Sequence, residues 1–405
     1  MKNEFLFAQA LNIQEPLYIE KIDFKKDDGE LHIYINFRKG STFKCSVCNK
    51  DGMPVHDTEK KTWRHLDFFQ YKAYIHFRRP RVTCPEHNTH IIKVPWGGTG
   101  SGFTLLMEAM IMELARHMPV SEIAKKIGEY DTKVWRVINR NINNARATEN
   151  FTDVKSVGVD ETASKKGHKY ITIFVDMDKN KVLFATEGKD SSTLKRFNED
   201  LVQHSGIPLN ITEFSADMSR AFAKGIDEHF KSAFITFDKF HVVKIINEAV
   251  DKTRREEQKE NAILKNSRYI WLKNPSNLSD KQSESLENLS KLNLKTARAY
   301  RIKLSLQEIY NKCTNVEEAE ERLNKWISWA SRSRLKSMKE AAKTIKQHFT
   351  GILRYFHTRL TNGILEGING IVQAARARAR GFRNTKNFIA MVYLLGSKLT
   401  FNYEL

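Results

Sequence analysis

The order of apolar stretches between residues 154 and 257 constrains the fold of this chain more than any other feature. Three β-branched stretches, "VKSVGVD", "KYITIFVDMD" and "KVLFATEG", follow one another with short connections, which predicts an antiparallel meander. Two more, "ITEFSAD" and "SAFITFD", alternate with expected helices. This alternation favours parallel strands that are joined by helical crossovers.

Strand, strand, strand, helix, strand, helix, strand, helix is the order of a ribonuclease H-like fold. In that fold the first and fourth strands lie side by side at the centre of the sheet. Here the first strand ends at Asp160 and the fourth at Asp217, so these two carboxylates are expected to meet. Glu161 is expected to point away, because side chains alternate along a strand.

Two short turns near the amino terminus have the spacing of metal ligands. Cys45 and Cys48 form C-x2-C, and Cys84 and His87 form C-x2-H. Thiolate and imidazole groups in such pairs are typical of a tetrahedral structural zinc site, so we expect one Zn²⁺ to join the turns. His90 is an alternative fourth ligand. Two unrelated buried thiols and a surface histidine are the alternative without a metal.

Apolar and polar residues alternate with period two around both turns, which predicts short, half-exposed strands. Residues 1–100 are therefore expected to form a β-rich zinc-binding domain. The turn-rich stretch "PWGGTGSGF" follows, and beyond it the apolar period becomes helical. We expect a domain boundary near residue 100.

Residues 101–150 have the outline of a helix-turn-helix. Gly128 permits a tight turn between two amphipathic stretches. The second helix of such a motif lies in the major groove of DNA, so Lys133 and Arg136 are expected to face the bases and Arg140 the backbone. A helix pair in an ordinary helical domain is the alternative, and the basic composition favours DNA.

The charge balance favours a polyanionic partner. Lys and Arg number 67 against 48 Asp and Glu, a formal net charge of +19 over 405 residues. Nucleic acid is the first candidate and an acidic membrane surface the second. The sequence has no apolar run long enough to cross a bilayer and no signal-peptide pattern, so a cytoplasmic protein without a membrane partner is expected. Four cysteines are too few for a disulfide scaffold.

The chain resembles the ISL3 family of DDE transposases, which insertion sequences encode. The resemblance covers nearly the whole chain and rests on the paired Cys and His turns, "GVDE", "SADMSRAF", "FDKFHVVK" and "TNGILEGINGIVQAARARARGFRN", in that order. It implies a bacterial, cytoplasmic and nucleoid-associated DNA transposase. Such a protein would bind the terminal inverted repeats of its insertion sequence and a target DNA, cleave and join strands, and assemble as a homodimer or higher oligomer on double-stranded DNA ends.

The resemblance also implies that Asp160, Asp217 and Glu366 form an acidic triad. Independently, a third carboxylate is expected from a helix that faces the sheet, and Glu366 stands on the otherwise uncharged stretch "TNGILEGING". The simpler interpretation of Glu366 is an acidic residue in the first turn of a helix, where the helix dipole favours negative charge.

Carboxylates suit this chemistry because they are hard oxygen ligands that hold Mg²⁺ without closing the site to a substrate phosphate. Two Mg²⁺ ions, which Mn²⁺ can replace, would help to deprotonate a water and to stabilise the leaving oxygen. Asp160 is expected to bridge the ions, because it leaves the central strand. Asp217 and Glu366 are expected to complete one metal site each.

Two other residues are candidates for an accessory role. Asp238 ends the fifth strand and His241 follows it in "FDKFHVV". A helix-capping aspartate and a partly buried histidine are the simpler alternatives.

Four arginines follow the third acidic residue. Arg376, Arg380 and Arg383 would share one face if the last helix continued through them, so their guanidinium groups are expected to follow a DNA phosphate strand. In relatives, basic residues usually follow the glutamate at the positions where this chain has Ile371 and Gln373.

The predicted architecture is multidomain α+β. The carboxy-terminal part is expected to be an α/β ribonuclease H-like catalytic domain with a large all-helical insertion, because no strand pattern occurs between the fifth strand and Glu366. The expected domains are 1–100 (zinc-binding), 101–150 (helix-turn-helix), 151–245 (first part of the catalytic core), 246–355 (helical insertion) and 356–405 (core helix that carries the glutamate).

Two other functions fit parts of the sequence. A zinc and helix-turn-helix regulator would bind DNA without cutting it, and it would be expected to have lost at least one of the carboxylates. A structure-selective nuclease of the same fold would share the metal chemistry, but it has no need of sequence-reading domains ahead of the catalytic core.

Overall fold

The computed structural model describes residues 3–403 except 99, 166 and 168. Residue 99 belongs to the turn at the expected boundary near residue 100, so that part of the turn lies outside the described residues. The chain forms two compact units. The first unit contains residues 1–146 and 399–405, and the second contains residues 147–398. The expected boundaries inside each unit stay predictions.

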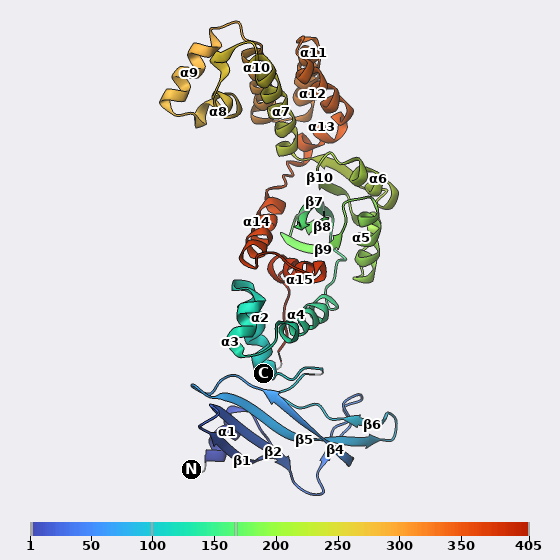
Figure 1. Ribbon diagram of the computed structural model, residues 1–405. Helices are drawn as coiled ribbons and strands as arrows, with labels where there is room; N and C mark the ends of the chain where they lie inside the picture. The colour runs from blue at the N-terminus through green and yellow to red at the C-terminus, as the bar shows by residue number, and fades with distance from the viewer. Residues whose placement is uncertain (1–2, 99, 166, 168, 404–405) are drawn as a thin grey trace. The chain divides into compact units, whose positions relative to one another are not determined.

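The first unit begins with a sheet of six strands in the order β1-β2-β5-β4-β3, with β6 paired to β5 (Figure 1). Only the β2–β5 pair among these strands is parallel. The elements of this unit are α1 (Asn3–Ala10), β1 (Leu17–Lys25), β2 (Glu30–Phe37), β3 (Thr42–Phe43), β4 (Met53–Arg64), β5 (Lys72–Cys84), β6 (Asn88–Ile91), α2 (Leu105–His117), α3 (Val120–Ile127) and α4 (Asp131–Arg146).

The core of this sheet follows from the period-two alternation. Leu31, Ile33 and Ile35 on β2 are buried together with Ile75 on β5, and they pack around the fully buried Trp63. Full burial of one such side chain contributes roughly 1.5–3 kcal/mol. The residues between them in the sequence face the other side of the sheet, as a strand requires.

The helices α3 and α4 form the expected helix pair. Ile123 and Ile127 on α3 and Val134 and Ile138 on α4 are buried. Gly128 ends α3 in the left-handed conformation with φ +70°, which glycine adopts without the strain of a side chain. The turn therefore depends on that glycine.

The second unit is built on a five-stranded sheet in the order β11-β10-β7-β8-β9. The strands β7, β8 and β9 form the expected antiparallel meander. The strand β10 pairs with β7 in parallel, and β11 pairs with β10 in parallel. Its first elements are β7 (Ser156–Lys165), β8 (Lys169–Asp176), β9 (Lys181–Glu187), α5 (Ser192–Gln203), η1 (Pro208–Asn210), β10 (Glu213–Ala216), α6 (Arg220–His229) and β11 (Phe234–Phe237).

Among the described residues, only helices and short turns follow β11. They are α7 (Lys239–Glu257), η2 (Ala262–Leu264), α8 (Arg268–Leu272), η3 (Pro275–Asn277), α9 (Asp280–Ser290), α10 (Lys295–Lys312), α11 (Val316–Arg332), α12 (Lys336–Gln347), α13 (Phe349–Thr358), α14 (Gly363–Arg378) and α15 (Thr385–Gly396). Figure 1 shows α5 and α6 on one side of the sheet and α14 and α15 on the other.

The segment α7–α13 has its own apolar core. Trp271 and Trp326 are buried in it, and the indole N–H of Trp326 donates to the carbonyl oxygen of Ile302 at 2.8 Å. The segment returns to the sheet through α13, which packs against β11. The chain then continues into α14, so the folding of these helices decides where α14 begins.

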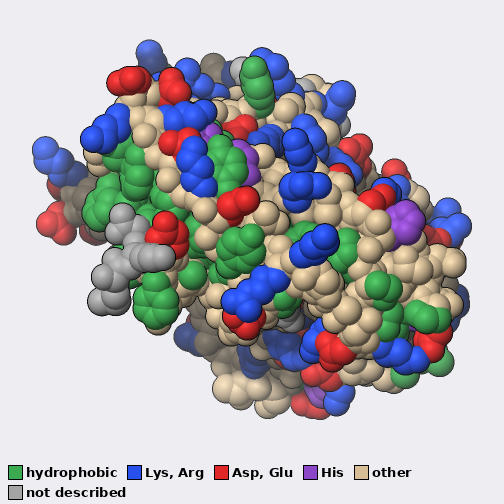
Figure 2. All heavy atoms as spheres, turned by 90° about the horizontal axis from the view of Figure 1, so that it is seen from below, with side chains coloured by type: hydrophobic (Ala, Val, Ile, Leu, Met, Phe, Trp, Pro, Cys, Tyr) green, Lys and Arg blue, Asp and Glu red, His purple; other side chains and the backbone are tan. Residues whose placement is uncertain are grey.

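Lysine and arginine side chains are spread over the face that Figure 2 shows, with acidic side chains among them. The basic side chains are therefore not concentrated in one patch on that face. Among the residues that the structure describes, no helix combines the length and the apolar character that a membrane crossing requires.

We expect Gly351→Ala to destabilise the junction between α13 and β11. A Cβ atom at Gly351 would lie 2.5 Å from Cδ2 of Phe237 and 3.0 Å from the carbonyl oxygen of Ile235, and neither neighbour can move freely. Overpacking of this kind costs about 1–3 kcal/mol of unfolding free energy, more than the helix gains from alanine. Calorimetric melting of the second unit measures the loss.

The matched control is Gly370→Ala on α14, where a Cβ atom would meet nothing within 4 Å. Alanine there should raise the stability by about 0.5–1 kcal/mol, because glycine costs more backbone entropy in a helix. Equal melting temperatures for the two variants would contradict the packing that we describe.

Candidate active site and metal centre

The four expected zinc ligands lie together. One ligand atom from each of Cys45, Cys48, Cys84 and His87 is within 4.8 Å of all the others. The Cys48 and Cys84 sulfur atoms are 3.9 Å apart, and the Cys84 sulfur is 3.5 Å from Nδ1 of His87. A tetrahedron with Zn–S bonds of 2.3 Å and Zn–N bonds of 2.0–2.1 Å has edges of about 3.5–3.8 Å, so these donors fit Zn²⁺.

The electrostatics of this cluster also suit a metal. Backbone N–H groups of Cys48 and Val47 point at the Cys45 sulfur and lower the pKa of this thiol to about 7. The N–H of Lys50 acts in the same direction on Cys48, but burial and the neighbouring thiols outweigh it and raise the pKa of Cys48. Three sulfur atoms at this spacing repel one another when ionised, and a bound cation removes that repulsion.

The position of Asp160 and Asp217 follows from the parallel pairing of β7 and β10. In this pair Gly158 lies opposite Ser215, so the two aspartates, each two residues further along, follow at corresponding positions of the two strands. Burial raises the pKa of Asp160 to about 6. The backbone N–H of Glu161 and the charge of His241 act against this rise, and the negative charge of Asp217 adds to it.

Glu161 lies between Asp160 and Thr162 on β7. The side chains of Asp160 and Thr162 both contact α14, so strand alternation places the Glu161 side chain on the other face. Burial raises the pKa of Glu161, and the charge of Asp217 raises it further, whereas Lys189 lowers it. The Glu161 N–H donates to Oδ1 of Asp160 at 2.8 Å. Asp160 and Glu161 lie within β7, which continues to Lys165, and Asp217 directly follows β10.

Glu366 lies in the first turn of α14, and its side chain is exposed. It does not join Asp160 and Asp217 in a compact cluster: among the described residues, only the Cys and His group brings three or more ligand atoms within 4.8 Å of one another. The residue three positions later does reach the site, because Nδ2 of Asn369 donates to Oδ2 of Asp160 at 2.8 Å.

The helix α14 lies along β7 through polar contacts at successive turns. After Asn369, the amide of Gln373 donates to the Thr162 hydroxyl at 2.7 Å and to the Ala163 carbonyl at 3.1 Å. Arg376 donates to the same carbonyl at 3.0 Å. Gln373 thus binds the protein's own central strand.

The start of α14 is anchored to the ends of two strands. Asn362 is buried, and its Oδ1 accepts from the Ser215 hydroxyl on β10 at 2.5 Å. Its backbone N–H donates to Oδ1 of Asp238 at 3.2 Å. The other oxygen of Asp238 accepts from the Phe240 N–H and caps α7.

Asp238 is therefore a buried cap that also fixes the turn before Glu366. Burial raises the pKa of Asp238, against the hydrogen bonds from Asn362 and the charge of His241. His241 is half-buried, and its charge acts on Asp160 as well as on Asp238.

The arginines at and after the end of α14 line a concave surface that encloses a volume of about 920 Å³. The expected helical face is wrong in detail, since α14 ends at Arg378, and Arg380 and Gly381 take positive φ values of +54° and +93°. The turn instead brings the side chains together with Lys165 from the end of β7, whose ammonium group donates to the Arg383 carbonyl. The surface has no acidic residue among its lining residues; its basic residues are Lys165, Arg376, Arg380 and Arg383.

The three cations expected on the second helix of the helix-turn-helix differ in their surroundings. Lys133 pairs with Glu129 at 2.6 Å and lies over the Phe103 ring. Arg140 pairs with Glu108 at 2.6 Å, and Glu108 is only 2% exposed. Arg136 is exposed on α4.

Sequence reasoning missed several residues of the site. Asn369 has a weak local signal, because it follows Glu366 by three positions and so lies on a similar side of the helix. Asn362, Ser215 and Lys165 have none, since their roles depend on contacts between segments that are far apart in the sequence.

Family models match the chain in three consecutive segments. One, described as the transposase of the ISL3 family, matches residues 157–392, more than half of the chain. Another, the helix-turn-helix domain of transposase family ISL3, matches residues 92–140. The third, a zinc-finger of the transposases IS204, IS1001, IS1096 and IS1165, matches residues 41–87. The last match includes His87 and ends before His90, and together with the Cys and His cluster it indicates a structural zinc.

Named relatives are similar over nearly their whole length. The transposase for insertion sequence element IS1557 of Mycobacterium tuberculosis is 28% identical, with 97% of this chain and 96% of that protein covered. The transposase for IS1001 of Bordetella parapertussis is 26% identical, with 92% and 94% covered. A solved chain of a simian T-cell lymphotropic virus intasome covers 43% of this chain and 63% of its own length at 14% identity, with a TM-score of 0.18, too low to indicate a shared fold.

We expect purified protein to contain one zinc ion per chain, measured by elemental analysis. Cys45→Ser and Cys84→Ser should abolish the metal content, and His87→Ala should weaken the affinity, because each change removes one donor. His90→Ala is the matched control and should keep the full zinc content. Loss of zinc from His90→Ala with retention in His87→Ala would reverse the ligand assignment.

We expect Arg140→Ala to lower the melting temperature of the first unit by several degrees. The change leaves the buried Glu108 carboxylate without its cation, and removing one partner of a buried pair costs roughly 3–5 kcal/mol at most. Arg136→Ala on the same helix removes an exposed charge and should leave the melting temperature unchanged. Equal melting of both variants would show that the Glu108 pair contributes nothing.

Proposed function

The chain belongs to the ISL3 family of transposases, and we propose that Asp160, Asp217 and Glu366 are the carboxylates with which it cleaves and joins DNA strands. The observation that carries this proposal is the meeting of Asp160 and Asp217 on neighbouring parallel strands, with the Asp160 pKa raised by burial and by the second aspartate. Burial and mutual repulsion disfavour the ionised form of two neighbouring carboxylates. A bound divalent metal would favour the ionised form instead.

The residues at this site suit Mg²⁺, because carboxylate oxygens are the ligands that it prefers. We propose that Asp160 bridges two ions and that Asp217 and Glu366 complete one site each. When bound, the ions supply the charge that activates a water and stabilises the leaving oxygen of a phosphodiester.

The other residues of the site position these carboxylates. Asn369 orients Asp160 through its hydrogen bond to Oδ2, which leaves the other oxygen of Asp160 with only the backbone N–H of Glu161. Asn362, held by Ser215 and Asp238, sets the start of the helix on which Glu366 stands. We propose that Glu366 approaches the two aspartates when metal and DNA bind, since its carboxylate is exposed and one helical turn from Asn369.

We also propose the finer architecture and partners. The order β11-β10-β7-β8-β9 supports a ribonuclease H-like catalytic core, with α7–α13 as the helical insertion within it. The first unit would bind the terminal inverted repeats, with Arg136 among the contacts. The basic surface after α14 would bind DNA phosphates, and the protein would act as a dimer or larger assembly on paired ends.

Substitution of any triad residue should abolish strand cleavage and joining but leave DNA binding nearly intact. Asp160→Asn, Asp217→Asn and Glu366→Gln keep the side-chain shape while they remove an anionic ligand, and loss of metal charge at a phosphoryl centre costs several powers of ten in rate. The assay uses a labelled duplex that contains the element's own end, with Mg²⁺, and maps the cut positions.

Asp238→Asn is the internal control. It keeps one oxygen to accept a backbone N–H and should retain measurable cleavage with a lower melting temperature. If Asp238→Asn abolishes cleavage while Glu366→Gln still cuts, the third ligand is Asp238, and the proposed triad is wrong.

A further inference from the structure

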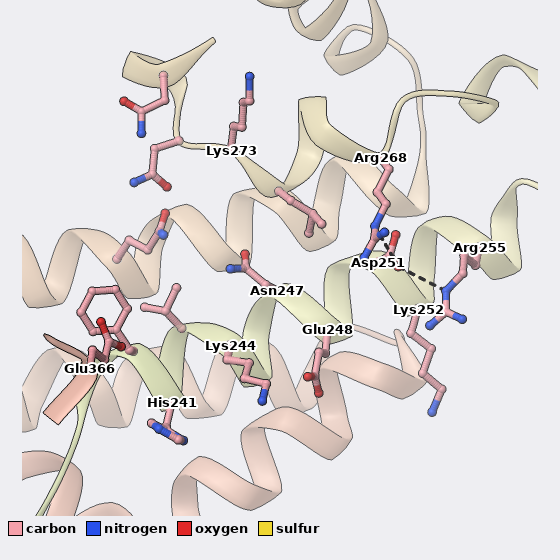
Figure 3. Close-up of a pocket in the computed structure, with 16 residues that line it drawn as sticks. His241, Lys244, Asn247, Glu248, Asp251, Lys252, Arg255, Arg268, Lys273 and Glu366 are labelled. Carbon is pink, nitrogen blue, oxygen red and sulfur yellow. Dashed lines mark ion pairs between the residues drawn. The ribbon is translucent and has the colours of Figure 1, made fainter. Parts of the chain in front are cut away.

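A cavity of about 1000 Å³ opens in the second unit beside Glu366. The exposed side of α7 forms one wall, and the segment from α8 to η3 forms the other. Figure 3 shows Glu366 and His241 toward one end and Arg255 and Arg268 toward the other. The cavity shares no lining residue with the basic surface after α14, so the two are separate surfaces.

The length of this cavity matches a stretch of DNA backbone. His241 and Arg255 are fourteen positions apart on the single helix α7, which corresponds to about 21 Å at a rise of 1.5 Å per residue. Phosphates along one strand of DNA follow one another at about 3.4 Å of axial rise. The wall is therefore long enough to follow several phosphates, starting beside Glu366.

The far end of the cavity holds an excess of positive charge. Three guanidinium groups share the single carboxylate of Asp251: Arg254 at 2.8 Å, Arg255 at 3.3 Å and Arg268 at 3.7 Å. One carboxylate balances one of these charges, so two remain. Arg255 and Arg268 line the cavity, and the dashed lines in Figure 3 mark their ion pairs with Asp251. An anion there would complete the charge balance.

Both walls carry further cations. Lys244 is exposed on α7, close to the end with the carboxylates. Lys273 on the opposite wall donates to the uncharged amide oxygen of Gln282, so its charge is not balanced there. The lining contains five lysine and arginine side chains and three carboxylates: Lys244, Lys252, Arg255, Arg268 and Lys273 with Glu248, Asp251 and Glu366. Lys252 also pairs with Glu340 outside the cavity at 2.9 Å, so four cations remain against three carboxylates.

A buried lysine holds the second wall in place. Lys303 is fully buried, and its ammonium group donates to the carbonyl oxygens of Trp271 at 3.2 Å, Leu272 at 2.5 Å and Lys273 at 3.3 Å. These acceptors end α8 and begin the turn that lines the cavity. A wall that is fixed before binding loses less conformational entropy when a ligand arrives.

We propose that this cavity binds the phosphate backbone of duplex DNA on one side of the scissile bond, with Lys244 and Arg268 as phosphate contacts. The inference rests on the proposed function, because it requires the scissile phosphate to lie at Glu366. The helical segment then serves as a DNA-holding part of the enzyme and not only as a spacer before α14. Such contacts position the strand without reading its sequence.

The test compares the full-length chain with the double variant Lys244→Gln and Arg268→Gln. Binding to a duplex with the element's terminal repeat and its flank is measured over a range of salt concentrations. Because each phosphate contact contributes about 0.9 to the slope of log K against log salt, the slope should fall by about 1.8. In phosphate-ethylation interference, ethylation of a run of adjacent phosphates on one side of the cut, in the repeat or in the flank, should weaken binding of the original chain. Ethylation of the same phosphates should no longer weaken binding of the double variant.

The double variant should fold, because Arg254 and Arg255 still neutralise Asp251 after Arg268 is changed. The matched control is Lys343→Gln with Lys346→Gln, which removes the same charge from exposed positions on α12 outside the cavity lining. This control should keep both the slope and the interference pattern of the original chain.

An unchanged slope and interference pattern in the double variant, with the original chain still cutting the duplex, would overturn this inference and leave the proposed function in place. An equal fall in the control would overturn it too, because a general charge effect would then explain the result. An original chain that neither binds nor cuts the duplex would refute the proposed function, and this inference with it.

Discussion

The parallel pairing of β7 with β10 is the interaction on which the second unit depends. It places segments more than fifty residues apart side by side at the centre of the sheet and brings Asp160 and Asp217 together. The arrangement disfavours the ionised form of Asp160, because burial and the charge of Asp217 both raise its pKa. Burial and like charge of this kind shift the pKa of a carboxyl group, and such shifts are frequent at functional sites.

The position of α14 depends on the same strands. Its start is held by Ser215 on β10 and by Asp238 after β11, and its length is held to β7 by Asn369 and Gln373. These contacts are polar hydrogen bonds, which contribute about 0.5–1.5 kcal/mol each and depend on geometry. A helix that is attached in this way has a defined direction, and Glu366 in its first turn is exposed.

The positive charge of the chain has several different uses. Arg140 neutralises a buried carboxylate, Lys303 ends a helix inside an apolar core, and Arg254 holds Asp251. Two separate concave surfaces and the exposed side of α4 carry further cations, which we propose as DNA contacts. Net charge alone therefore indicates the class of partner, but only the burial of each side chain shows which cations can reach it.

The sequence by itself determined the features that repeat locally. The periods of apolar residues predicted the meander, the parallel strands and the helices, and the C-x2-C and C-x2-H spacing predicted the Cys and His cluster, because these patterns depend on neighbours within a few residues. The tertiary structure decided that His87 and not His90 joins that cluster, and that the arginine turn leaves the helix at Arg378. The contacts of Asn369 and Asn362 join positions more than a hundred residues apart, and no local period records which distant segment a side chain will meet. The physical reason is that such pairings are chosen by the packing of the whole unit.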